Sequence, residues 1–127
     1  MAHARSFPTV PSWTRCCELF VATLQATGAD PYMGMNLHSL FVGAGLPPPS
    51  LRYVSRIGGA REHVVYVTNL VLAVLPEAER LGLVAPGEID PSTLLDRELA
   101  DVTASGSVVI GWSDIGAWST VPSHHPQ

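Results

Sequence analysis

The segment Ser107–Val121, SVVIGWSDIGAWSTV, determines how the rest of the chain is interpreted. Its first part, Val108–Trp112, is apolar at nearly every position, so a β-strand here would be apolar on both faces. Strands of this kind lie inside sheets, with helices over both faces and a neighbouring strand along each edge. Gly111 and Gly116 indicate a bulge or a division of the strand into two pieces.

A second strand is predicted at about residues 50–57, where Pro47–Pro49 excludes a helix and Gly58-Gly59 ends the extended segment. This strand can pair with one edge of Ser107–Val121. The pattern shows no further strand for the other edge, and stable monomers avoid an open apolar edge. The sequence therefore predicts a sheet that another chain completes.

Four to five helices are expected beside these two strands. Apolar residues at helical spacing, with cap and stop signals, predict these helices. They run from Ser12 to Gly28 (inward Trp13, Cys17, Phe20, Leu24), from Asp30-Pro31 to Gly45 (inward Met33, Leu37, Leu40, Phe41, Ala44), over Arg61–Leu75, over Glu77–Leu81 after a break or kink at Pro76, and over Ser92–Ala104 after Asp90-Pro91 (inward Leu95, Leu99, Val102). The Arg61–Leu75 helix is apolar nearly all round and should be covered on more than one side.

Composition excludes several classes of protein. A length of 127 residues allows one small domain, and 46% hydrophobic against 14% charged residues indicates a globular chain. The net charge of −4 and the absence of any Lys/Arg cluster argue against nucleic acid and anionic membranes as partners. All seven basic residues are Arg, which, with abundant Ala, Val, Gly and Pro, indicates a high-GC bacterial genome.

The expected compartment is the reducing cytoplasm. Met1–Val10 carries charge and proline where a secretion signal needs an apolar core, and the longest apolar run, Val64–Leu75, is too short to span a bilayer. Cys16 and Cys17 are adjacent, so on a helix their side chains point apart and no disulfide between them is expected. Both are expected to be small core residues.

Several stretches resemble one known family. GADPYMGMNL, LFVGAGLPPPSLRY, LPEAERLGL, EIDPSTLLDREL and the final SVVIGWSDIGAWSTVP resemble, in order and spacing, the C-terminal half of class I S-adenosylmethionine-dependent methyltransferases of the bacterial small-molecule type. The resemblance extends from about Phe7 to Pro122. It implies an α/β fold that forms the C-terminal portion of a Rossmann-like sheet. Residues 50–57 and 107–121 would be its antiparallel sixth and seventh strands, with the seventh between the fifth and the sixth.

In that reading the fifth strand is missing, which agrees with the unpaired edge. Residues 1–11 would form an extended N-terminal arm, residues 12–122 a methyltransferase-like C-terminal domain that acts as a substrate lid, and residues 123–127 a loose tail. The missing part would come from a second protein that docks along Ser107–Val121. This partner would supply the N-terminal half of the fold.

No cofactor is expected on this chain. In the family, S-adenosylmethionine sits on a glycine-rich loop after the first strand, and nothing here corresponds to that loop. The G-x-G within Val42–Pro47 follows a helix and is read as a helix stop. S-adenosylmethionine, if used, would lie on the partner chain. His124-His125 has no Cys, Asp or Glu cluster beside it, so no metal site is expected.

The resemblance also implies that the C-terminal helices roof a substrate pocket. By position, the candidate catalytic residues are His63 and Tyr66, which share one helix face and could move a proton or orient a hydroxyl. The candidate substrate-binding residues are Trp13, Tyr32, Met33, Asn36 and Asn69. The alternative is structural: Trp13 and Tyr66 would serve packing, and His63 would face water.

Three functions remain open at this stage. The chain could be the C-terminal subunit of a split methyltransferase-like enzyme in bacterial secondary metabolism, repurposed for an intramolecular substitution, elimination or cyclisation. The same complex could transfer a methyl group with the cofactor on the partner. Alternatively, the chain could be a non-catalytic scaffolding or regulatory homodimer, or a remnant of a full-length enzyme.

Overall fold

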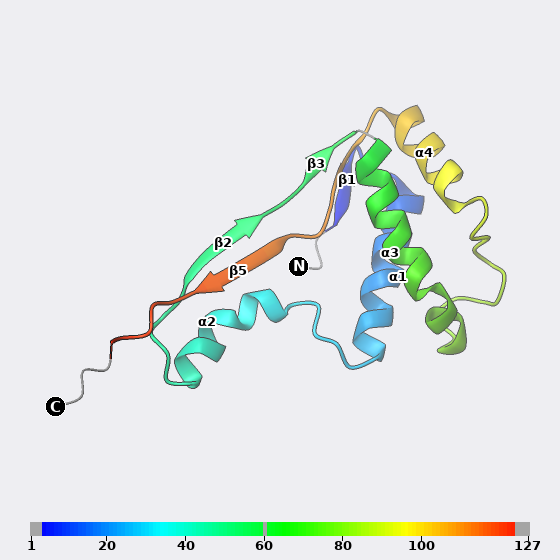
Figure 1. Cartoon of the computed structure of the whole chain (residues 1–127). Helices are drawn as coiled ribbons and strands as arrows, with labels where there is room; N and C mark the ends of the chain where they lie inside the picture. The colour runs from blue at the N-terminus through cyan, green and yellow to red at the C-terminus, as the bar shows by residue number, and fades with distance from the viewer. Residues whose placement is uncertain (1–3, 60, 124–127) are drawn as a thin grey trace.

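The structure, a computed structural model, describes residues 4–59 and 61–123 (Figure 1). In this part of the chain it is a mixed α/β fold with four helices and two small antiparallel sheets. The elements are, in order, β1 (Arg5–Phe7), α1 (Pro11–Ala26), α2 (Met33–Gly43), β2 (Ser50–Val54), β3 (Ile57–Gly58), α3 (Arg61–Arg80), α4 (Leu94–Ser105), β4 (Val108–Ile110) and β5 (Asp114–Trp118). Figure 1 shows α1, α3 and α4 as one helical body, from which a β-ribbon extends with α2 beside it.

The two predicted strands form this ribbon, and each is divided into two pieces. β2 pairs antiparallel with β5, from Ser50 opposite Trp118 to Val54 opposite Asp114, and β3 pairs antiparallel with β4. The two divisions lie opposite each other, where the Gly111 N–H donates to the Arg56 carbonyl oxygen at 3.0 Å. The predicted division of the last strand at Gly111 is thus confirmed.

β1 corrects the expected strand count. It pairs antiparallel with β4, from Arg5 opposite Ile110 to Phe7 opposite Val108, which gives the strand order β1–β4–β3. The expectation that the last strand has only one neighbour in this chain is therefore wrong for β4. It holds for β5, which pairs with β2 alone among residues 4–59 and 61–123.

The core lies between α1, α3 and α4. α3 buries one stripe of residues, which includes Val64, Val67, Val71 and Leu75, and this stripe packs mainly against α1 and α4. The opposite face carries Tyr66, whose side chain is 45% exposed. The expectation that this helix is covered on more than one side is met in part, because α1 and α4 both pack against it while Tyr66 stays exposed.

The helix starts also differ from the predicted ones. α1 has Val10 as its N-cap and Pro11 in its first turn, so Ser12 is not the cap. The Asp-Pro pairs form turns before the helices: the Asp30 carboxylate accepts the Tyr32 N–H at 2.8 Å, and the Asp90 carboxylate accepts the Ser92 N–H at 2.9 Å. Asp side chains commonly stabilise such turns, which is why α2 and α4 begin a few residues later.

Pro76 does not break its helix, so of the two predicted effects, a break or a kink, the break is wrong. α3 runs through it to Arg80, so the separate helix predicted at Glu77–Leu81 does not exist. Pro76 lies on the exposed side of the helix, while its neighbours Leu75 and Ala78 are buried. Packing of this buried stripe offsets the backbone hydrogen bond that proline cannot donate.

α2 lies against β5 and has no buried residue. Its predicted inward stripe is only partly correct, because Leu37 and Phe41 are half-buried while Met33, Leu40 and Ala44 are exposed. The contact is close at Gly34, where a methyl group would lie 2.8 Å from Ile115 Cδ1. The helix ends before Gly45, whose φ of +78° suits glycine, so the interpretation of this G-x-G as a helix stop is confirmed.

Candidate functional site

A hollow of about 260 Å³ lies between the first turns of α3 and strand β4. It is lined by Arg56, Glu62, His63, Tyr66, Val67, Val109, Gly111 and Trp112. Its walls combine buried apolar side chains with four groups that can donate hydrogen bonds. Because all of these residues belong to this chain, the hollow exists without a partner.

The two predicted catalytic residues meet at this hollow. His63 and Tyr66 lie three residues apart on α3, and both line the cavity. The imidazole of His63 rests against the backbone of Gly58 at the end of the ribbon. An imidazole and a phenol on one wall can exchange a proton with a bound ligand or orient its hydroxyl group.

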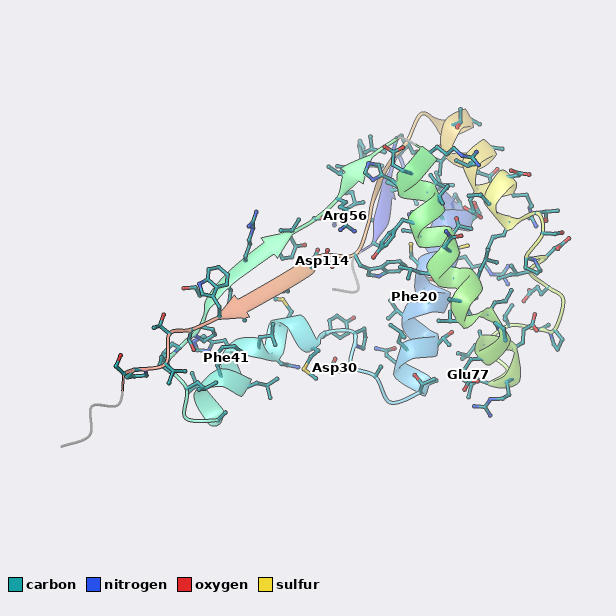
Figure 2. All side chains as sticks on the ribbon, viewed as in Figure 1. Phe20, Asp30, Phe41, Arg56, Glu77 and Asp114 are labelled. Atoms are coloured by element: carbon teal, nitrogen blue, oxygen red, sulfur yellow. The ribbon has the colours of Figure 1, made fainter. Side chains whose placement is uncertain are left out.

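Arg56 was not predicted, and it adds a cation to the site. It lies in the division between β2 and β3, and its guanidinium carbon stands 5.3 Å from the centroid of the Tyr66 ring. One guanidinium nitrogen lies 3.6 Å from Asp114 Oδ2, a long contact between two side chains that are each more than half exposed. Figure 2 shows Arg56 and Asp114 near each other where the ribbon meets the helical body.

Trp112 is the second residue that sequence reasoning missed. Its side chain is only 7% exposed, and its ring centroid lies 4.6 Å from that of Phe20. The indole N–H is buried and has no hydrogen-bond partner in the described part of the protein. The Trp13 N–H and the Thr68 hydroxyl are likewise buried without a partner in the described part of the protein.

The remaining candidates are distributed over three places. Asn69 lies in a second hollow on the open face of α3, which adjoins the first because Glu62 and Tyr66 line both. Tyr32 lines a third hollow, on the α1 side of Trp112. Met33 and Asn36 lie exposed on α2, where the Asn36 amide donates to the Asp30 carboxylate at 3.0 Å.

Trp13 occupies a different environment from the other candidates. Its side chain is 0% exposed and packs in the main core cluster, as the structural alternative for this residue expects. Among the predicted residues, the structure therefore brings together His63, Tyr66 and Asn69. It separates them from Trp13 and from the α2 residues.

A partly buried polar cluster lies between α1 and α4, away from the hollow. The Ser12 hydroxyl lies 2.8 Å from Asp101 Oδ2 and 3.2 Å from Glu98 Oε2, and the Cys16 thiol lies 3.8 Å from Glu98 Oε1. Burial raises the pKa of Glu98, and burial is also the main cause that raises the pKa of Cys16 and of Cys17 to about 12. Both thiols are free and buried, as predicted, and remain protonated at neutral pH.

Neither a metal centre nor a membrane span is visible in the described residues. Within 4–59 and 61–123, no group of three or more His, Cys, Asp or Glu side chains could hold a metal ion. No helix of that part is both long and apolar enough to cross a bilayer. His124-His125 lies outside the described residues.

Comparison with known proteins gives no relative: no family model, curated protein or solved structure matches this chain.

Proposed function

We propose that this chain is the C-terminal subunit of a split, methyltransferase-like heteromeric enzyme that acts on a small molecule in bacterial secondary metabolism. Its part is to supply the roof of the substrate pocket. A second protein supplies the N-terminal half of the fold and docks along the free edge of β5. The proposal rests on the resemblance described above, and three structural features support it.

The free edge of β5 is the observation that carries the proposal. β1 pairs with the first part of the last strand, in the position that the family gives to its fifth strand, but it is only three residues long. Beyond it, Asp114–Trp118 pairs with one described strand, β2, and no strand of the described residues pairs with its other backbone edge. A strand added there would continue the line of β1 and satisfy the free N–H and C=O groups of the edge.

The exposed apolar side chains of the ribbon and α2 support the same conclusion. Large hydrophobic residues exposed in this region include Phe7, Met35, Leu51, Tyr53, Ile57 and Trp118. Exposed apolar groups that gather on one part of a protein mark an interaction surface. A partner that completes the sheet would cover part of this surface.

The hollow between α3 and β4 supports the role as a pocket roof. In the version that we favour, the complex has lost methyl transfer and catalyses an intramolecular substitution, elimination or cyclisation. His63 acts as the base, Tyr66 orients a hydroxyl or carbonyl group, and the hollow holds the substrate in a reactive conformation. In the other version the partner binds S-adenosylmethionine and the roof only positions the methyl acceptor.

Calorimetry with S-adenosylmethionine on the purified heteromer separates the two versions. Absence of binding favours the repurposed reaction, and saturable one-to-one binding favours methyl transfer. The heteromer itself is tested by co-expression with the product of a neighbouring gene, followed by a mass measurement. A chain that stays monomeric at high concentration, with or without that product, would contradict the proposal.

A homodimer is the second candidate, and the same edge favours it. An antiparallel strand edge can pair with a copy of itself around a two-fold axis, which would join two β5 strands into one sheet. Mass measurement distinguishes this arrangement directly. A stable dimer of the chain alone, with both β5 edges protected from hydrogen exchange, would support a scaffolding or regulatory role.

A further inference from the structure

We infer that the hollow between α3 and β4 binds a small aromatic carboxylate, whose carboxylate group is held by Arg56 and whose ring lies on a floor formed by Val67, Val109 and Trp112. The inference depends on the proposed function in one respect: the ligand is a substrate only if the chain is part of an enzyme. Binding itself concerns residues of this chain alone.

The size of the hollow limits the ligand to about one ring. Its volume is about 260 Å³, whereas sites for drug-sized molecules have about 300–1,000 Å³. Val67 and Val109 are each 1% exposed and form an apolar floor. An aromatic ring with one or two substituents satisfies both the volume and the apolar surface.

The polar groups of the hollow favour a ligand that accepts hydrogen bonds. Arg56, His63 and Tyr66 place hydrogen-bond donors around this space. Glu62 contributes the only carboxylate among the lining residues.

Charge favours an anion over a cation because of the position of Arg56. Its guanidinium already covers the Tyr66 ring face, which a cationic ligand would otherwise use. Its contact with Asp114 is long, and no side-chain hydrogen bond engages it within the described residues. The guanidinium can therefore turn two N–H groups toward a carboxylate. The carboxylates of Glu62 and Asp114 repel a bound anion, so removal of either charge should tighten its binding.

The test is an NMR titration of the ¹⁵N-labelled chain with benzoate. Benzoate is expected to shift the indole N–H resonance of Trp112, assigned with Trp112→Phe, and to leave that of the core residue Trp13 unchanged. Benzamide, which has the same shape without the charge, should bind about tenfold more weakly. Benzylammonium should bind more weakly still. Where the wild type self-associates, the titration uses the Trp118→Lys variant, whose substitution lies on the ribbon outside the hollow.

Four variants complete the test. Arg56→Gln should weaken benzoate binding about tenfold, while Arg52→Gln, an exposed arginine of β2 outside the hollow, should leave it unchanged. Glu62→Gln and Asp114→Asn should each tighten binding, because each removes a negative charge near Arg56. The inference is wrong if benzoate does not bind, if benzamide or benzylammonium binds at least as tightly, or if Arg56→Gln has no effect. Because no partner is involved, these results can fail or succeed independently of the heteromer.

Discussion

The imidazole of His63 lies directly against the backbone of Gly58, so that a methyl group on Gly58 would stand 2.5 Å from His63 Nε2. This contact fixes one wall of the hollow, because it joins the start of α3 to the end of β3. Only a residue without a side chain can occupy position 58 while the imidazole keeps its place.

Gly58→Ala should therefore displace the His63 ring and weaken ligand binding, while the chain stays folded because the clashing atoms end a side chain that can rotate. His63→Ala should remove the clash. Urea denaturation of both single variants and the double variant should give a coupling energy of about 0.5–3 kcal/mol. Additive effects would mean that the contact does not exist.

Trp13 and Trp118 should differ strongly in their contribution to stability. Trp13 is 0% exposed in the core, whereas Trp118 is 55% exposed on the ribbon. Trp13→Ala should lower the free energy of unfolding by about 3–5 kcal/mol, and Trp118→Ala by about 0.5 kcal/mol or less in the isolated chain. Chemical denaturation measures both. Equal losses would contradict the placement of Trp13.

Glu98 should make stability fall as pH rises. Burial raises its pKa in the folded state above the ordinary value of 4.5, so the folded protein binds the proton more tightly than the unfolded chain does. This contribution is present below pH 4.5 and is lost as pH rises through the raised pKa. Glu98→Gln should remove that loss, and its advantage over the wild type should grow with pH.

The control for this prediction is Asp96→Asn, because Asp96 is an exposed carboxylate on the same helix. Thermal unfolding of the three proteins between pH 4 and pH 8 provides the comparison. A wild type whose stability relative to Glu98→Gln does not change with pH would show that Glu98 is not desolvated.

Cys16 and Cys17 should be unreactive in the native protein. Burial is the main cause that raises the pKa of both thiols to about 12, and the thiolate is the reactive form. A chromogenic thiol reagent at pH 8 should modify both cysteines only after unfolding. Rapid modification of either cysteine in the folded state would show that its side chain on α1 is accessible to solvent.

Much of the ribbon could be predicted from sequence, because Pro47–Pro49 and the glycines around each strand leave few alternatives. β1 could not, because three residues with one inward side chain, Ser6, are too few to show an alternating pattern. The continuation of α3 through Pro76 depends on the burial of Leu75 and Ala78. Helix propensities and stop signals in the sequence do not account for this tertiary packing, so they did not predict the continuation.

The candidate site shows the same division. His63 and Tyr66 could be found because both lie on one helix at a spacing that places them on one face. Arg56 lies between β2 and β3 and Trp112 lies between β4 and β5, far apart in sequence, and only the pairing of β3 with β4 brings them to α3. A single sequence does not indicate that these residues lie close together in the folded chain.

Trp118→Lys should block association along β5 without unfolding the chain. The residue is exposed, and a charged side chain on an edge strand opposes the addition of another strand. Leu83→Lys, at an exposed position just after α3, is the matched control. Pull-down with the co-expressed partner should fail for Trp118→Lys and succeed for Leu83→Lys. Equal capture of both variants would place the interface elsewhere.

Hydrogen exchange at Asp114–Trp118 tests the central claim most directly, when it is measured on the chain alone and on the chain purified with its partner. Amides of β5 that point away from β2 should exchange quickly in the isolated monomer and become strongly protected in the heteromer. Unchanged exchange along β5 in a complex of proven mass would contradict the claim that another polypeptide completes this sheet.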